Sequence, residues 1–176
     1  VAAAPTKRES APVIGLYTTH LRILLEEAAP HLNAQYTAEA LLAMLGRPVT
    51  GLRAFTVRDG LFQPIPFQVD EFDKKGRMIL PQGKKPMRDE DKGMLDVNDE
   101  VVVMAMDLGD RATDGKFPPG MWAAAEVEVG NPGGAERGWF YVLDFDAPPP
   151  ESPLRYVKYD PAKDVAESPL FLLDFN

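Results

Sequence analysis

The stretch that decides the fold begins with PIPFQVDE (residues 64–71) and ends with LDVNDEVVVMAMDLGD (residues 95–110). In both parts a short apolar run of the kind found in β-strands adjoins a group of acidic residues. The first run ends in acidic residues, whereas the second begins with them. If the two runs are neighbouring strands, their acidic ends meet at one corner of the sheet.

The oxygen-rich corner is a candidate Ca²⁺ site, because a hard cation prefers carboxylate and amide oxygens and relieves their repulsion. The spacing is not that of an EF-hand loop. Two alternatives remain: solvated turn carboxylates that bind nearby backbone, and an acid and base pair for glycoside cleavage. The candidate ligands are Asp70, Asp96, Asn98, Asp99 and Glu100.

The turn residues favour a mainly β, sandwich-like domain. Seventeen prolines and fourteen glycines cut the 176-residue chain into short elements, and proline is poorly tolerated inside helices and central strands. Asp59-Gly60 predicts a tight hairpin turn between strands at 49–57 and 61–69, with the second strand at a sheet edge. The alternation in 125–129 and the apolar run 139–143 predict a second hairpin. Further strands are expected at 154–159 and 170–175.

Two short helices are expected before this domain. Leucines recur at helical spacing in residues 19–29, and a second amphipathic run occupies residues 37–45. Pro30 ends the first run, and Gly46 with Pro48 ends the second. The sequence therefore predicts an N-terminal helical extension (residues 1–48) followed by a β-sandwich-like domain (residues 49–176).

Composition bounds the partners. The formal net charge is −8, which argues against nucleic acid and anionic membrane surfaces. The chain has no cysteine, which excludes disulfides, thiolate metal sites and thiol nucleophiles. No apolar run approaches the roughly 20 residues of a membrane span. The small residues at 1–6 are typical of a mature start after signal-peptide cleavage, although a frayed terminus has the same composition.

Two further sets of residues have alternative interpretations. His20 and His31 could ligate haem together with Met104, Met106 or Met121. In the alternative interpretation the histidines are surface or helix-end residues and the methionines fill the core. The aromatic residues could form a sugar-stacking platform if they share an exposed face, or belong to the core. These aromatic residues are Trp122, Trp139, Tyr141, Tyr156 and Tyr159.

The two stretches resemble a pattern in largely uncharacterised secreted or periplasmic bacterial proteins. In those proteins a proline-led strand ends in Gln-hydrophobic-Asp-acidic, here residues 66–71, and a later Asp-x-x-Asp-Glu precedes an apolar strand, here residues 96–106. Some carry this pattern in β-sandwich domains beside carbohydrate-active modules. The resemblance implies an exported location and a β-sandwich fold, and it supplies no catalytic residue.

Together these features predict a non-catalytic accessory or binding subunit of an exported assembly, in the periplasm or at the cell surface. Its partners would be other protein subunits of an envelope complex, with carbohydrate a further candidate. The first alternative is a calcium-stabilised carbohydrate-binding or carbohydrate-processing module. The second alternative is a haem-binding electron-transfer subunit.

Overall fold

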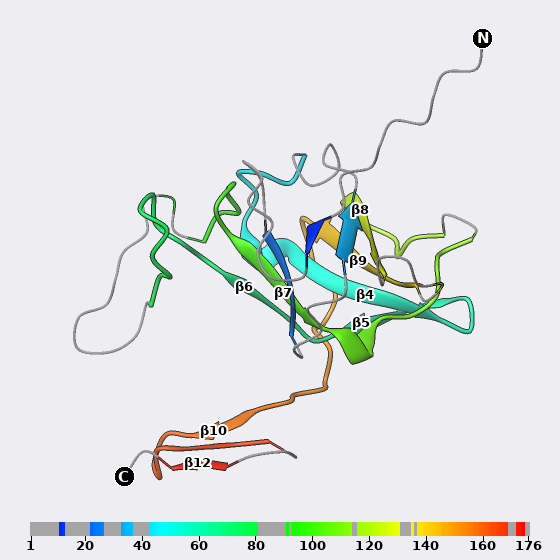
Figure 1. The fold of residues 1–176 in the computed structure, drawn as a ribbon. Helices are drawn as coiled ribbons and strands as arrows, with labels where there is room; N and C mark the ends of the chain where they lie inside the picture. The colour runs from blue at the N-terminus through cyan, green and yellow to red at the C-terminus, as the bar shows by residue number, and fades with distance from the viewer. Residues whose placement is uncertain are drawn as a thin grey trace.

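The computed structural model describes residues 11–12, 22–26, 33–36, 43–80, 91, 93–113, 116–130, 135, 137–168 and 172–174. These residues form a mainly β structure with three sheets and two single-turn 3₁₀ helices, η1 (Val49–Gly51) and η2 (Ala105–Asp107) (Figure 1). The expectation of a mainly β protein is confirmed. Within these residues no helix is long and apolar enough to cross a membrane.

The largest sheet has six strands in the order β1-β3-β8-β9-β4-β5. All of its neighbouring strands are antiparallel. Their bounds are β1 (Ala11–Pro12), β3 (Asn33–Tyr36), β4 (Leu52–Arg58), β5 (Leu61–Ile65), β8 (Met121–Gly130) and β9 (Arg137–Phe145).

Local sequence explains the two hairpins of this sheet. Asp59 and Gly60 have φ values of 53° and 73°, the positive angles of a tight turn that matches strand twist. Pro64 lies in β5, which is an edge strand, where its missing N–H costs no ladder bond. In β8 the residues at 125, 127 and 129 are buried and the two glutamates between them are half-buried, as the alternation predicts.

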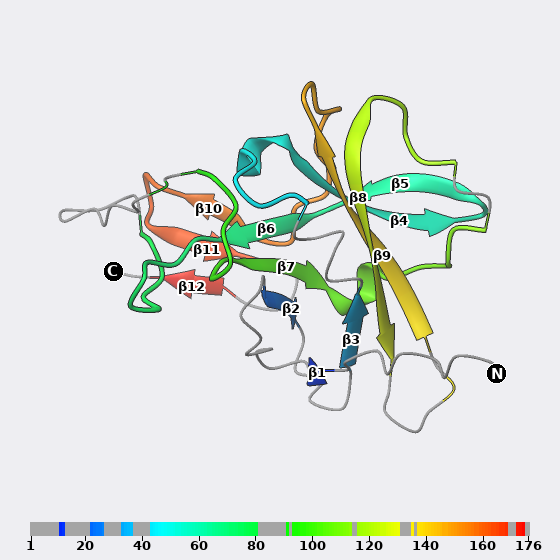
Figure 2. The same ribbon diagram turned by 90° about the horizontal axis from the view of Figure 1, so that it is seen from above.

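The second sheet has three strands in the order β2-β7-β6 (Figure 2). They are β2 (Arg22–Glu26), β7 (Glu100–Met104) and β6 (Phe67–Asp70). β6 and β7 are antiparallel, whereas β2 and β7 are parallel. Pro66 separates β5 from β6 and so lies where the chain passes from the first sheet to the second.

The first two sheets share one hydrophobic core. Val101 and Val103 of β7 are buried in the same cluster as Val127 and Phe140 of the large sheet. A second cluster covers the opposite face of the large sheet, where Phe62 and Phe117 pack on buried Tyr141. Both faces of β9 are therefore covered, and all but its first three residues are buried. These two sheets are called the body below.

The third sheet consists of β10 (Lys158–Asp160), β11 (Val165–Glu167) and β12 (Leu172–Asp174), paired antiparallel in that order. It is called the C-terminal sheet below. It lies apart from the body, to which a single extended stretch, the connector (residues 146–157), joins it (Figure 1).

The predicted helix at 19–29 is wrong over residues 22–26, which form strand β2. Its backbone pairs with β7 from Arg22 opposite Glu100 to Glu26 opposite Met104. Helical spacing is a weak local preference, and pairing with a buried strand overrides it. Of the predicted helix at 37–45, only residues 43–45 are described, and they belong to a turn. The N-terminal helical section therefore has no support, and the domain boundary after residue 48 stays a prediction.

Candidate functional site

The two acidic groups lie at one corner of the second sheet. β6 runs antiparallel to β7, and Asp70 at the end of β6 lies directly opposite Glu100 at the start of β7. The two acidic groups are therefore side by side, as the sequence pattern predicts. The acidic corner is defined here as Asp70, Glu71, Asp73, Asp96, Asn98, Asp99 and Glu100.

Asp99 is the buried centre of this corner. Its side chain is fully buried, and its two oxygens bind backbone from both acidic stretches. Oδ1 accepts the Phe72 N–H at 3.2 Å, and Oδ2 accepts the Asp96 N–H at 2.9 Å. The carboxylate thus connects the exit from β6 to the entry into β7.

The neighbouring side chains make the same kind of contact. Glu71 Oε1 accepts the Gly93 N–H at 2.6 Å, and Asp96 Oδ1 accepts the Asn98 N–H at 2.8 Å. The Asn98 amide donates to the carbonyls of Phe72 and Asp73 at 2.9 and 3.1 Å. Oxygens that already bind backbone N–H groups are less open to a cation, which favours the turn-carboxylate alternative for this part of the corner.

The candidate calcium ligands have different surroundings. Asp70 is half-buried and accepts a hydrogen bond from Gln68, whereas Glu100 is buried. Across the described part of the chain, no group of three or more His, Asp or Glu side chains is arranged to hold a metal ion. The calcium site therefore stays a prediction.

The electrostatics of the corner follow from burial. Desolvation raises the pKa of Asp99 to about 7, with Asp96 and Glu71 adding like-charge repulsion and the backbone N–H groups opposing it. Burial also raises the pKa of Asp96, which neighbours Asp91. In contrast, hydrogen bonds from Arg77 lower the pKa of Asp73 to about 2. One corner thus holds carboxyl groups with opposite shifts.

The haem prediction gains no support. His20 and His31 lie outside the described residues. Met104 and Met121 are half-buried, and Met106 is exposed.

The five aromatic candidates do not form one platform. Tyr141 is fully buried among Phe62 and Phe117, and Trp139 packs on the same cluster. Tyr156 donates to Asp107. Trp122 and Tyr159 are exposed, at 55% and 57%, and lie in different sheets. The core interpretation therefore holds for Tyr141 and Trp139, while Trp122 and Tyr159 need another explanation.

Trp122 lies beside an ionic cluster that the sequence did not reveal. The Arg47 guanidinium lies 5.0 Å from the centre of the Trp122 ring. Arg47 also binds two carboxylates, Asp144 at 2.6 Å and Asp146 at 2.5 Å. Because Arg47 and Asp144 are 97 residues apart, no local motif could have indicated this cluster.

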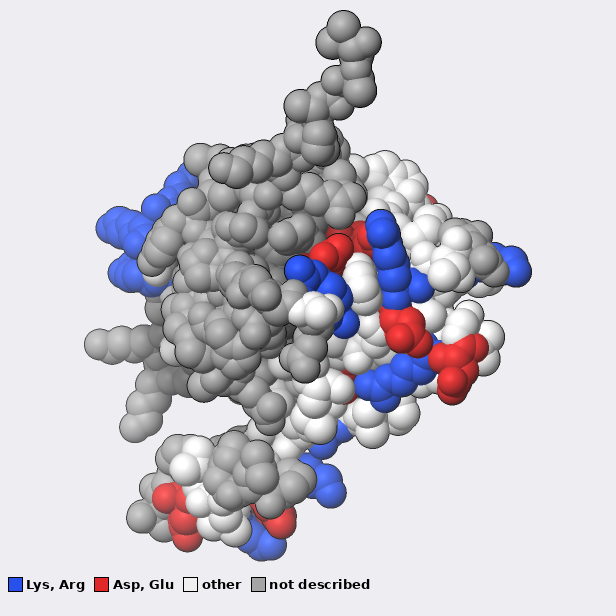
Figure 3. All heavy atoms as spheres, turned by 45° about the vertical axis from the view of Figure 1, so that its right-hand side comes forward, with Lys and Arg blue, Asp and Glu red and all other residues white. Residues whose placement is uncertain are grey.

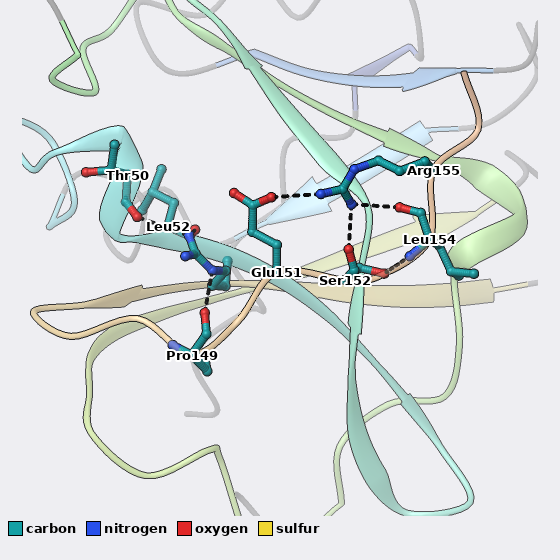
Figure 4. Close-up of polar contacts among 8 residues, drawn as sticks. Thr50, Leu52, Pro149, Glu151, Ser152, Leu154 and Arg155 are labelled. Atoms are coloured by element: carbon teal, nitrogen blue, oxygen red, sulfur yellow. Dashed lines mark hydrogen bonds and ion pairs between the residues drawn. The ribbon is translucent and has the colours of Figure 1, made fainter. Parts of the chain in front are cut away.

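Hydrogen bonds hold the connector on the body before it reaches the C-terminal sheet. Arg53 donates to the Pro149 carbonyl at 2.8 Å, and Ser152 is buried. Figure 4 shows these contacts with those of Arg155, which binds the Ser152 carbonyl and the Glu151 carboxylate. Tyr156 donates to buried Asp107 at 2.5 Å. The C-terminal sheet therefore starts from a fixed point.

The C-terminal sheet has one apolar and one charged face. Its register places Tyr159, Ala166 and Leu173 side by side, and side chains in register share a face. The opposite face carries two rows: Lys158, Glu167 and Leu172, and then Asp160, Val165 and Asp174. Tyr159 and Leu173 are 57% and 48% exposed, so the apolar face is largely open to solvent.

Charges of both signs are interspersed on the face of the molecule shown in Figure 3, where the C-terminal sheet forms a separate lobe below the body.

No protein-family model, no curated protein and no solved structure gives a significant match to this chain.

Proposed function

We propose that this protein is a non-catalytic accessory subunit that binds a partner protein through the apolar face of its C-terminal sheet. The observation that carries the proposal is the exposed row of Tyr159, Ala166 and Leu173. The body is then a β-sandwich-like scaffold, formed by two sheets around one core, that holds this face in position.

An uncovered apolar face is unusual on so small a sheet. Each of its strands has three residues, and a sheet of this size needs its hydrophobic face packed against something to be stable. Exposed apolar surface with a polar rim marks interaction sites. Leu154 and Val157 of the connector, which precedes this sheet in the chain, are also exposed.

Charge favours a partner with a basic rim. Residues 158–174 contain two lysines and four carboxylates, a net charge of −2, within a chain of net charge −8. Complementary charge around an apolar centre speeds encounter and excludes wrong partners. The expected occupant is therefore an apolar protein surface bordered by Lys or Arg, and not a second copy of this acidic chain.

The location of this partner follows from the resemblance described above. An exported protein of this kind would meet its partner in the periplasm or at the cell surface, as a subunit of an envelope assembly.

The test compares two neighbouring leucines of β12 with opposite faces. Leu173→Ser removes an apolar contact from the proposed face, whereas Leu172→Ser removes a 62% exposed leucine from the charged face. Wild-type and Leu172→Ser proteins should capture the same partner from native envelope extracts, with cross-links in residues 158–174. Leu173→Ser should weaken capture about tenfold or more, because central apolar contacts dominate interfaces.

Three outcomes contradict the proposal. The first is equal capture by the wild-type and Leu173→Ser proteins, and the second is a set of cross-links confined to the body. The third is a concentration-dependent homodimer in light scattering that Leu173→Ser dissociates, since the face would then bind a second copy.

A further inference from the structure

A β-bulge presents Trp122 to solvent at the start of β8. Met121 pairs with Phe145 and Ala123 pairs with Asp144, so two steps along β8 correspond to one step along β9. Trp122 is the additional residue and is 55% exposed. Bulges redirect side chains, and they are frequent beside binding sites.

The Arg47 guanidinium lies against one side of the Trp122 ring and is held there by two ion pairs. Arg47 lies over the ring and binds Asp144 and Asp146. Asp144 is fully buried, and its Oδ1 has no hydrogen-bond partner. Removing Arg47 would leave this carboxylate buried without a counter-charge, which is strongly unfavourable.

Gly51 allows this carboxylate to pack closely. A Cβ atom at position 51 would lie 2.9 Å from Asp144 Oδ1 and 2.8 Å from the Phe145 carbonyl oxygen. The absence of a side chain there lets the loop that carries Arg47 approach the end of β9. Trp122, Arg47 and Asp146 are therefore preorganised, which lowers the entropy cost of binding.

We infer that Trp122, Arg47 and Asp146 form a binding site for a neutral saccharide. Trp122 supplies an exposed apolar ring, Arg47 over one face of the ring supplies a donor, and the 77% exposed side chain of Asp146 bound to Arg47 supplies acceptors. A pyranose ring has the matching chemistry, an apolar C–H face surrounded by hydroxyl groups. An aromatic plane with a few fixed polar groups is the usual design of small-ligand sites.

The charges of the site favour a neutral sugar over a charged one. Arg47 is already paired with Asp144 and Asp146. One guanidinium and two carboxylates carry a net charge of −1, which repels acidic sugars. The site is separate from the C-terminal sheet, and the inference does not depend on the proposed protein partner.

The test is native gel electrophoresis through gels that contain soluble polysaccharides. The probes are neutral mixed-linkage β-glucan, xylan and galactomannan, with acidic polygalacturonate for comparison. The wild-type protein should be retarded by at least one neutral probe. Trp122→Ala should raise the Kd for that probe about tenfold, the scale of an aromatic stacking contact, while Trp122→Phe should retain most of the affinity.

Met106→Ala is the matched control, because Met106 is a large apolar residue that is 60% exposed away from this site. It should bind as the wild-type protein does, and so should Leu173→Ser. Trp fluorescence should change on addition of the probe in the wild-type protein and not in Trp122→Ala. Retardation by none of the neutral probes, or equal retardation of Trp122→Ala, would overturn the inference.

Discussion

The body and the C-terminal sheet are both built largely from antiparallel strands, yet their apolar residues have opposite environments. In the body, Val101, Val127 and Phe140 are buried between two sheets. In the C-terminal sheet, Tyr159 and Leu173 also share a face with their strand neighbours, and that face is open. The same period-two pattern thus produces a buried core in one region and an open apolar face in the other, depending on whether a second layer covers it.

The largest expected effect is on the body. Phe140→Ala should lower the free energy of unfolding by about 3–5 kcal/mol, because it leaves a cavity in a fully buried site. Leu173→Ala in the C-terminal sheet should change it by less than about 0.5 kcal/mol. Urea denaturation measures both values. Similar losses for the two variants would mean that the C-terminal sheet has a covered core of its own.

The acidic corner should make the stability of the body depend on pH. The pKa of Asp99 is about 7 in the folded protein and 3.8 in its unperturbed form, so the folded state binds more protons between these values. The free energy of unfolding should therefore fall by roughly 2–4 kcal/mol as the pH rises from 4 to 7. Asp96, whose pKa is also raised, acts in the same direction.

Asp99→Asn should flatten this dependence, as measured by urea denaturation at several pH values. Asp73, with its pKa lowered to about 2, contributes with the opposite sign and mainly below pH 4, so it does not mask the effect. A variant curve as steep as that of the wild-type protein would show that another group titrates.

A smaller effect is expected where the connector joins the body. Tyr156→Phe removes the hydroxyl that donates to buried Asp107, whose Oδ2 has no hydrogen-bond partner. The substitution should lower the free energy of unfolding by about 1–2 kcal/mol and accelerate proteolysis of the connector. Tyr159→Phe is the control, because its partner Asp164 is exposed, and it should cost less than about 0.5 kcal/mol. Equal losses of unfolding free energy in the two variants would contradict the expected difference between the connector and the C-terminal sheet.

Local patterns predicted several parts of the fold correctly. Asp59-Gly60 indicated the β4–β5 hairpin because both central residues of such a tight turn have positive φ angles, which Asp and Gly tolerate. The alternation of valine and glutamate in β8 identified its buried face. The meeting of the acidic groups at one corner followed from antiparallel pairing of the strands that carry them.

The role of Asp99 was not predictable in the same way. The sequence allowed both a metal ligand and a turn carboxylate that binds nearby backbone, and the structure shows that Asp99 accepts the N–H groups of Phe72 and Asp96. Whether Asp99 reaches these N–H groups depends on how the chain between β6 and β7 folds. Phe72 is 27 residues away from Asp99, and no spacing rule covers that distance.

The sequence by itself determined the β class, the two hairpins and the acidic corner, because turn angles and period-two burial are properties of neighbouring residues. Only the tertiary structure decided that residues 22–26 form a strand that pairs with β7. It also decided that Arg47 binds Asp144, 97 residues away in the sequence, beside Trp122. The exposure of the apolar face of the C-terminal sheet was decided in the same way. These features depend on which surfaces pack together, and that is fixed by the free energy of the whole chain.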